Sequence, residues 1–288
     1  MKFQLLKIYE SHLAIGEVNL ANVLPSYRSP RDLAVNNGFL IGPNKDIILY
    51  NLQFGFRADW APELPPTISS PPNFFKTKAA IDKCRARFDA EIRKGRMVGG
   101  VGWTAKHVKH FLGKQFYTIP CGAVPKNNDP EGRIIHNYSY PSAKIGSVNS
   151  ALINTSVSYI SFRERVALLE KVDWFIKADL KNGYRQLPVH PSDWHTQVYS
   201  LGPNEYFIDL NMPFGKANSS KIFCTWTTAW RISFQFHFQN CYSIPIALSS
   251  YVDDFFGGPV RTGSKRNDKK NARLLLENLI SIGDYTNT

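Results

Sequence analysis

Acidic side chains at the ends of two apolar stretches have the clearest chemical potential in this sequence. The tetrapeptide Tyr251-Val-Asp-Asp254 places two adjacent carboxylates at the tip of a predicted hairpin, and Asp179 ends another apolar strand. Crowded carboxylates repel one another, and their pKa values rise unless a cation neutralises them. Carboxylate and carbonyl oxygens at strand ends are hard ligands that suit Mg²⁺. Two such ions about 3.5–4 Å apart could activate an attacking hydroxyl and stabilise a leaving pyrophosphate, which is the chemistry of phosphoryl transfer.

A structural interpretation of the same residues stays open at this point. Asp favours hairpin tips because its carboxylate accepts hydrogen bonds from the backbone, so Tyr251–Asp254 could be an Asx-type turn without chemistry. Packing is likewise the simpler role for His136, beside a second predicted hairpin, and for His190, which has no visible acid–base partner.

Short strands interleaved with helices must position the carboxylates. Local patterns predict helices over 77–94, 160–171, 216–240 and 267–281, and strands over 117–124, 133–138, 174–180, 195–201, 205–210, 246–251 and from 255 onward. Strands and helices in this order, with some strands paired as hairpins, predict an α+β architecture and not a doubly wound sheet. Aromatic residues recur every three or four positions within 216–240 and predict a helix core face instead of a base-stacking platform. They are Phe223, Trp226, Trp230, Phe234 and Phe238.

The chain divides into two predicted regions at a stretch rich in proline. Residues 1–72 are expected to be an irregular N-terminal region with a Pro-rich linker, because Pro does not fit inside a helix or a central strand. The prolines are Pro62, Pro65, Pro66, Pro71 and Pro72. Residues 73–288 are the predicted main domain. In it, a Gly-rich passage over 95–102 leads to a hairpin whose polar turn is expected at Lys126–Gly132.

The composition favours an intracellular protein with a polyanionic partner. The 288 residues carry 35 Lys and Arg against 23 Asp and Glu, a net charge of +12, which favours nucleic acid over a membrane surface. A basic surface that only keeps the chain in solution is the alternative. No apolar run approaches the ~18–20 residues that span a bilayer, and the N-terminus lacks a signal-peptide core, so no membrane or secreted protein is expected. The 4 cysteines form no C-x-x-C pair, which disfavours disulfides and zinc and fits a cytoplasmic or nuclear protein.

Several motifs in one order along the chain together resemble those of a reverse transcriptase. Those that resemble the fingers hairpin and its continuation are Gly122-Ala-Val-Pro-Lys126, Gly132-Arg-Ile-Ile-His136, Ser139-Tyr-Pro141 and Ser147-Val-Asn149. Ala178-Asp-Leu-Lys-Asn-Gly-Tyr-Arg-Gln-Leu-Pro-Val-His-Pro191 is similar to the first catalytic palm motif, and Tyr251-Val-Asp-Asp254 to the second. Met212-Pro-Phe-Gly-Lys-Ala-Asn218 looks like the motif that grips template and nucleotide. The likeness covers about residues 70–284 and is greatest to DIRS-type retrotransposons, which integrate with a tyrosine recombinase.

The resemblance implies a right-hand polymerase fold of fingers and palm only, in which helices back an antiparallel palm sheet. It also implies that Asp179, Asp253 and Asp254 are catalytic. Asp179 and Asp253 would bridge two Mg²⁺ ions, with Mn²⁺ as an alternative, and the Leu180 carbonyl would be a further ligand. Asp254 would be a secondary metal ligand or an electrostatic support.

The resemblance also implies where the nucleotide binds. Lys126 and Arg133, on the two arms of the fingers hairpin, would clamp the triphosphate, and Arg is the stronger candidate because its planar fork binds phosphate through two hydrogen bonds. Tyr184 would block a ribose 2′-hydroxyl and so favour deoxynucleotides; the alternative is an ordinary core tyrosine. Phe214 and Gly215 would lie along the nucleotide and the template strand.

The end of the chain and the hairpin tip add two further expectations. Tyr251 and Val252 would contact template and primer. The chain stops at Thr288, where the resemblance implies a further palm strand, a thumb and commonly an RNase H domain, so a C-terminally truncated chain is expected. Asn137 stands where many relatives have Asp, which puts one local fingers contact in doubt.

Two functions from different classes remain in competition. The first is an RNA-directed DNA polymerase of a retroelement, which extends a primer 3′-hydroxyl with deoxynucleoside triphosphates on an RNA or DNA template, with truncation as a source of impaired activity. The second is a catalytically silent nucleic-acid-binding remnant of a retrotransposon, which the missing thumb favours and the intact carboxylates disfavour. An RNA-templated RNA polymerase is disfavoured by Tyr184.

Overall fold

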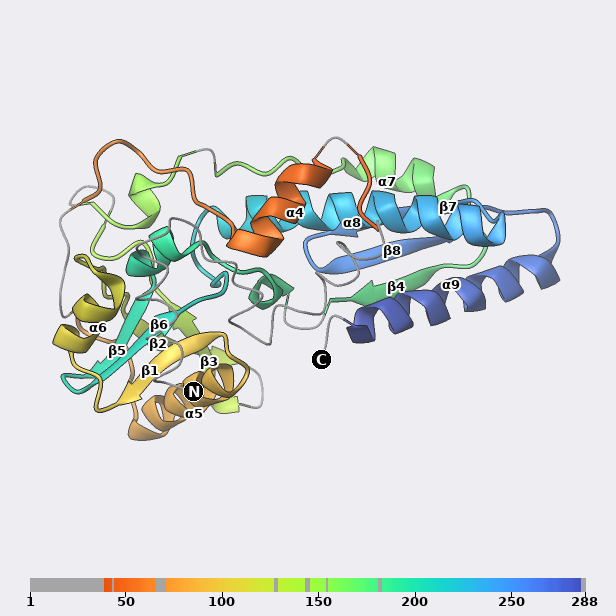
Figure 1. Ribbon diagram of the computed structural model, residues 1–288. Helices are drawn as coiled ribbons and strands as arrows, with labels where there is room; N and C mark the ends of the chain where they lie inside the picture. The colour runs from red at the N-terminus through yellow and green to blue at the C-terminus, as the bar shows by residue number, and fades with distance from the viewer. Residues whose placement is uncertain are drawn as a thin grey trace. The chain divides into compact units, whose positions relative to one another are not determined.

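Helices and antiparallel sheets make up the described part of the protein, which confirms the predicted α+β class (Figure 1). The computed structural model describes residues 39–42, 44–65, 71–126, 129–142, 146–153, 155–180 and 183–285. These residues form two compact units. The first unit contains the described residues of 51–155 and 187–219, and the second contains those of 39–50, 156–186 and 220–285.

Two antiparallel sheets organise the first unit. One has the order β1-β6-β5, and the other is the hairpin β2-β3. The strands are β1 (Met97–Val101), β2 (Cys121–Lys126), β3 (Asp129–His136), β5 (Val198–Gly202) and β6 (Glu205–Asp209). The helices of this unit include α5 (Lys78–Arg93), α6 (Ala105–Leu112), η3 (Asn149–Ala151) and η5 (Pro191–Thr196).

Helix α5 starts at a threonine cap and buries one face in the core of the first unit. The Thr77 hydroxyl accepts a hydrogen bond from Ala80 N at 3.1 Å, which satisfies one of the free amides of the first turn. Cys84 and Phe88, one helical turn apart, are buried, and the Phe88 ring lies 4.8 Å from the Phe207 ring of β6. The other buried members of this core are Met97, Tyr117, Ile119, Cys121, Ile134, Tyr138, Val148 and Tyr199.

Strand β1 is a tertiary feature that the sequence pattern did not predict. The Gly-rich passage was expected only to lead to the hairpin, but Met97–Val101 pairs with β6 along its whole length. Gly99 has φ +123°, and a Cβ there would clash with the carbonyl oxygen of Tyr206. Glycine therefore permits the close approach of β1 to β6, a requirement that strand propensity does not express.

Three antiparallel strands in the order β4-β8-β7 form the sheet of the second unit. They are β4 (Ile176–Asp179), β7 (Ile246–Tyr251) and β8 (Asp254–Pro259). The unit also contains α7 (Phe162–Leu169), η4 (Gly183–Gln186), α8 (Ser219–Tyr242) and α9 (Lys265–Tyr285), and α9 packs along β4 and β8 (Figure 1). Helices thus back the sheet, as the sequence predicted.

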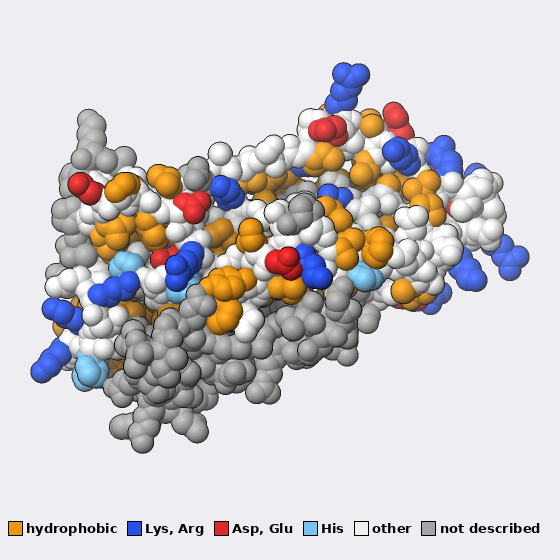
Figure 2. Space-filling view, turned by 45° about the horizontal axis from the view of Figure 1, so that its top comes forward, with side chains coloured by type: hydrophobic (Ala, Val, Ile, Leu, Met, Phe, Trp, Pro, Cys, Tyr) orange, Lys and Arg blue, Asp and Glu red, His pale blue; other side chains and the backbone are white. Residues whose placement is uncertain are grey.

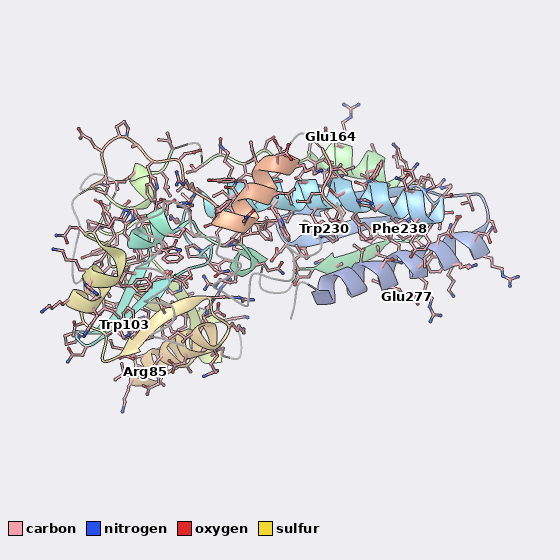
Figure 3. The ribbon with its side chains drawn as sticks, viewed as in Figure 1. Arg85, Trp103, Glu164, Trp230, Phe238 and Glu277 are labelled. Atoms are coloured by element: carbon pink, nitrogen blue, oxygen red, sulfur yellow. The ribbon has the colours of Figure 1, made fainter. Side chains whose placement is uncertain are left out.

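The aromatic face predicted for α8 is confirmed as core. The five aromatic residues Phe223, Trp226, Trp230, Phe234 and Phe238 are all buried. Figure 3 labels Trp230 and Phe238 on this helix. The Trp230 ring stacks on Phe234 at 5.2 Å and lies 4.9 Å from Phe255 of β8. Aromatic contacts of this kind add about 0.5–1.5 kcal/mol to the effect of burial alone, so α8 holds β8 firmly in the sheet.

Other predicted elements agree with the structure except at their ends. Helices expected over 77–94, 160–171, 216–240 and 267–281 correspond to α5, α7, α8 and α9. The hairpin ladder continues from Lys126 to Asp129, so the turn predicted at Lys126–Gly132 is too long. Residues 127–128 at its tip lie outside the described residues.

The prediction that residues 1–72 are irregular is wrong for residues 45–54. Helix α4 (Lys45–Phe54) forms there and buries Ile48 and Leu52, four residues apart on one face. Residues 1–38 and 66–70, including part of the Pro-rich linker, lie outside the described residues. The predicted boundary after residue 72 stays a prediction. Helix α6, capped by Thr104, was also not predicted.

The surface of the described part carries many basic side chains. Figure 2 shows Lys and Arg side chains spread over the face that it displays, consistent with the net charge of +12. Lys126, Arg133, Arg163 and Lys269 are among the exposed basic residues. Within the described ranges, no helix is both long enough and apolar enough to pass through a membrane.

Candidate active site

Strand pairing brings the three carboxylates predicted from the sequence to one end of the β4-β8-β7 sheet. Asp179, the last residue of β4, lies opposite Asp254, the first residue of β8. The Leu180 N–H donates to the Asp253 carbonyl oxygen at 2.9 Å, which ties the end of β4 to the turn between β7 and β8. Directly opposite residues of an antiparallel pair project from the same face, so Asp179 and Asp254 share one face of the sheet.

The turn that carries Asp253 contains a strained residue. Tyr251 pairs with Asp254, which leaves Val252 and Asp253 as the turn, and Val252 has φ 57°. A β-branched residue in the left-handed region is uncommon and costs of the order of 1–3 kcal/mol. Such strain is concentrated at functional sites in proteins, and it is therefore consistent with selection for the position of Asp253.

The Asx-turn alternative finds no support in the hydrogen bonds of the described residues. No backbone N–H of these residues donates to the carboxylate of Asp253 or Asp254. Instead, Asp254 Oδ1 lies 2.9 Å from Lys177 Nζ, two residues before Asp179 on β4. The Asp254 carboxylate therefore pairs with a lysine side chain of the neighbouring strand.

The electrostatics of Asp179 reflect the crowding of acidic groups. Burial raises the pKa of Asp179, and the negative charges of Asp253 and Asp254 raise it further. Lys177 opposes this effect only in part. A cation among these carboxylates would relieve their mutual repulsion, because it stabilises the charged form of each.

The donors present fit Mg²⁺ in chemistry but do not form an all-protein cage. Among the residues that the structure describes, no three His, Cys, Asp or Glu side chains are grouped closely enough to hold a metal ion. Mg²⁺ commonly uses only one or two carboxylates and completes its shell with water and substrate phosphates. Asp179 and Asp253 could supply those carboxylates, whereas Asp254 is engaged by Lys177. The Leu180 carbonyl already accepts from Gly183 N at 3.1 Å and keeps one further lone pair.

Tyr184 lies in η4 beside the carboxylates and packs on α8. Its hydroxyl lies 2.9 Å from Ser220 Oγ, and its ring meets the Phe223 ring edge-on at 4.9 Å. Burial raises the pKa of the Tyr184 hydroxyl. These contacts also suit an ordinary core tyrosine, so the role in sugar selection stays a prediction. Residues 181–182 of the same motif lie outside the described residues.

Tyr251 has two neighbours that sequence reasoning missed. Its ring lies 4.9 Å from the Tyr159 ring, and the Arg165 guanidinium lies 4.8 Å above its face. Arg165 also lies 5.6 Å from the Phe256 ring. Tyr159 and Arg165 belong to the segment around α7, and no local pattern in the sequence connects them with the hairpin.

The fingers-like residues lie in the first unit. Lys126 is exposed at the end of β2, and Arg133 is exposed on β3 opposite Val124. The Arg133 guanidinium lies 5.9 Å from the centre of the Phe214 ring. A cation over an aromatic face is held in a preferred orientation, so the structure joins two residues that the resemblance assigned to one nucleotide.

Two motifs of the first unit hold each other through Asn149. Asn149 Nδ2 donates to the Gly215 carbonyl at 3.0 Å, and Asn149 Oδ1 accepts from Ala217 N at 2.8 Å. Gly215 has φ +95°, and a Cβ there would lie 2.7 Å from the His136 carbonyl oxygen. The loop after Met212 therefore requires glycine at this point and lies against the end of β3.

Lys216 is a buried cation whose environment the sequence did not reveal. Its side chain is only 4% exposed, and Nζ donates to Thr196 Oγ1 at 3.0 Å and lies 5.0 Å from the Trp60 ring. Burial lowers its pKa to about 8, although Asp193 and Asp209 oppose this shift. The sequence placed Lys216 in the motif that starts at Met212, but nothing in that motif indicated that its side chain is buried.

Two histidines for which packing was expected make contacts within the first unit. The His136 ring lies 4.4 Å from the Tyr199 ring and stacks on Phe88 at 5.8 Å. His190 is buried, and its Nε2 lies 3.1 Å from Arg57 Nη2.

The candidate residues thus fall into two groups, one in each unit. Those of the second unit are Asp179, Leu180, Tyr184, Tyr251, Val252, Asp253 and Asp254. Those of the first unit are Lys126, Arg133, Phe214 and Gly215. The catalytic and nucleotide-binding roles of all of them stay predictions.

Comparisons with known proteins reveal a similar fold. No family model and no curated protein matches the sequence. A crystal structure of the prototype foamy virus protease–reverse transcriptase (CSH mutant, selenomethionine-labelled) matches with 16% identity and a TM-score of 0.51 and covers 78% of this chain. The native form of that protein matches with 17% identity and a TM-score of 0.49. This chain spans 25% of the length of either structure, and at such low identity the first match bears on the fold alone. The chain therefore has a reverse transcriptase-like fold.

Proposed function

We propose that this chain is an RNA-directed DNA polymerase of a retroelement, with its greatest likeness to the DIRS type. The observation that carries the proposal is the pairing of Asp179 with Asp254 beside the strained turn that holds Asp253. Three acidic groups at the end of one sheet, with a raised pKa at Asp179, are an arrangement that favours a bound divalent cation. The reverse transcriptase-like fold supports the same reaction class.

The reaction is the transfer of a nucleotidyl group to a primer. The primer 3′-oxygen forms a bond to the α-phosphorus of a deoxynucleoside triphosphate, the bond from that phosphorus to the bridging oxygen breaks, and pyrophosphate leaves. The hydroxyl proton passes to water. Asp179 and Asp253, with the Leu180 carbonyl, would hold Mg²⁺ or Mn²⁺, which lowers the pKa of the hydroxyl and stabilises the charge on pyrophosphate. Asp254, paired with Lys177, would support their position.

The other candidate residues would bind the substrates. Arg133, oriented by Phe214, and Lys126 would bind the triphosphate, because Arg binds phosphate through two hydrogen bonds and Lys as a point charge. Tyr184, fixed by Ser220 and Phe223, would exclude a 2′-hydroxyl. Template and primer would contact Tyr251 and Val252 at the turn and Gly215 beside Phe214.

The decisive experiment is primer extension by the D253N variant. An RNA template with a DNA primer, Mg²⁺ and deoxynucleotides should give extension by the parent, and D253N should lose about 10³-fold or more, because it removes a carboxylate ligand of the cation that stabilises the developing charge. D173N is the matched control: Asp173 belongs to the same unit and pairs with Arg261 at 3.0 Å, away from the carboxylate cluster. Equal extension by D253N and parent contradicts the proposal. Replacement of deoxynucleotides by ribonucleotides in the same assay tests the RNA polymerase alternative.

A second function is favoured by one observation. Lys177 already neutralises Asp254, with its Nζ 2.9 Å from Asp254 Oδ1. A catalytically silent nucleic-acid-binding protein could keep this pair without losing its function, because it needs no carboxylate for a metal ion. A gel-shift assay with the same template and primer distinguishes the two functions, since salt-sensitive binding without extension supports the silent protein.

A further inference from the structure

A cavity of ≈240 Å³ adjoins the turn that carries Asp253 and shares Val252 with the residues proposed to contact template and primer. Its lining includes Ser249 and Ser250 of β7 and Val252 of the turn. The other walls come from α8, from α7 and from the segment that precedes α7. All of the lining residues belong to the second unit, so the cavity is a property of that unit alone.

The cavity contains a half-buried cation without a counter-ion. Arg231 of α8 lines it, and its Nη1 donates to the Leu248 carbonyl at 3.1 Å and to Gln235 Oε1 at 2.7 Å. Within the described part of the chain, no carboxylate forms a salt bridge with Arg231, and its Nε and Nη2 have no hydrogen-bond partner. Burial lowers the pKa of Arg231, which is the signature of a charge that has lost water and gained no opposite charge. An anion at this position would offset that cost.

Hydroxyl groups form most of the remaining polar wall. They belong to Ser158, Tyr159, Thr227, Thr228, Ser249 and Ser250, of which Thr227 already donates to the Cys224 carbonyl at 3.2 Å. Neither Asp nor Glu occurs among the described residues that line the cavity. Hydroxyl and guanidinium donors with no opposing carboxylate suit an oxyanion, and the fork of Arg binds phosphate or carboxylate through two parallel hydrogen bonds.

A second cavity of ≈320 Å³ extends the first along α8. The two share Ser158, Cys224 and Thr228. Lys221 lines the second cavity, and no acidic residue is found among its described lining residues either. Together the two cavities are large enough for a ligand bigger than a single phosphate group. Arg231 lines the first cavity, and Lys221 lines the second.

We propose that these adjoining cavities bind a small organic anion, whose phosphate or carboxylate group meets the fork of Arg231 and whose body passes Thr228 toward Lys221. The ligand would lie against Ser250 and Val252 and so stabilise the strained turn. Binding itself does not depend on the proposed polymerase function.

The test uses the full-length chain with pyrophosphate and citrate as probes, at an ionic strength held constant with KCl. Isothermal titration calorimetry and thermal unfolding should reveal saturable binding of at least one probe and a higher melting temperature. Binding of pyrophosphate alone assigns the ligand to phosphate compounds, and binding of citrate alone assigns it to carboxylates. R231Q should weaken binding at least 10-fold, and R231K should weaken it less because it keeps the charge but not the fork.

Two further variants keep the proposal falsifiable. R273Q on α9 is the control for general attraction to a basic protein, because Arg273 is 83% exposed, and it should bind like the parent. S158L fills the space shared by the two cavities without changing Arg231, and it should also weaken binding, so it decides the matter if R231Q does not fold. The proposal is overturned if neither probe binds the parent above the KCl background. It is also overturned if S158L binds as tightly as the parent.

Discussion

At the scale of single residues, burial decides how two lysines behave. Lys177 is exposed, and its hydrogen bond and attraction to Asp254 raise its pKa. Lys216 is buried beside Trp60, and loss of water lowers its pKa to about 8. The first lysine is charged at any physiological pH, whereas the second keeps its charge only at a cost to folding. Identical side chains thus have opposite effects because one is solvated and the other is not.

The lowered pKa of Lys216 predicts how stability changes with pH. Below about pH 8 the lysine is charged in the folded and in the unfolded chain, and burial of the charge destabilises the fold in full. Between about 8 and 10.5 the unfolded chain binds more protons than the folded chain, so stability rises with pH across this window. K216M lacks this titration. Urea unfolding at pH 8 and pH 10 should show that the advantage of K216M over the parent shrinks at the higher pH.

The control for this prediction is K109M, which removes an exposed lysine from α6 in the same unit. The stability difference between K109M and the parent should be nearly the same at both pH values. An unchanged difference for K216M as well would show that Lys216 does not titrate in this window.

At the scale of elements, α8 links the hydrophobic core to the candidate active site. Its buried face contacts Phe255, which directly follows Asp254 on β8, and its Phe223 supports the Tyr184 ring. The helix was predictable because its aromatic residues repeat with helical spacing. Strand β1 was not predictable, because Gly99 is there for close approach to β6 and not for strand propensity.

Removal of the central ring of α8 should therefore destabilise the second unit. W230A should lower the free energy of unfolding by about 3–5 kcal/mol, because it deletes a buried ring that stacks on Phe234 and contacts Phe255. F236A on the same helix is the control, since Phe236 is 48% exposed, and it should change stability by less than about 0.5 kcal/mol. Urea or thermal unfolding of both variants measures the difference. Equal losses would mean that the core does not form on the Trp230 face.

At the scale of the whole molecule, net charge is the property that most clearly indicates which kind of partner the protein binds. The net charge of +12 and exposed residues such as Lys126 and Arg133 provide attraction to phosphate groups without sequence readout. The alternative is a basic surface that only opposes self-association, and it does not require that the protein bind nucleic acid. Salt dependence separates the two interpretations, because nucleic-acid binding releases counter-ions from the phosphate backbone.

The affinity for an RNA–DNA duplex should fall steeply with salt. Four or more phosphate contacts would reduce the association constant by about 100-fold between 50 and 200 mM salt. R133A should decrease the slope of log affinity against log salt by about 1 if Arg133 contacts a phosphate. Fluorescence anisotropy of a labelled duplex measures both effects. A flat salt response would favour the alternative and remove nucleic acid from the list of partners.

The sequence by itself determined the local features of this protein. Helical spacing of aromatic residues predicted α8, turn residues predicted the hairpin at Tyr251–Asp254, and the order of motifs indicated Asp179, Asp253 and Asp254 as one set. The helix and the hairpin could be predicted because each depends mainly on residues a few positions away, whereas the set of carboxylates rests on the resemblance and stays a prediction.

Only the tertiary structure decided which distant residues meet. It set Asp179 opposite Asp254, paired Lys177 with Asp254, buried Lys216 beside Trp60 and enclosed Arg231 in a cavity. Strand register, burial and pKa depend on packing between residues far apart in the chain, and no local periodicity contains that information. The physical reason is that these energies arise from neighbours in space, while a sequence pattern records neighbours along the chain.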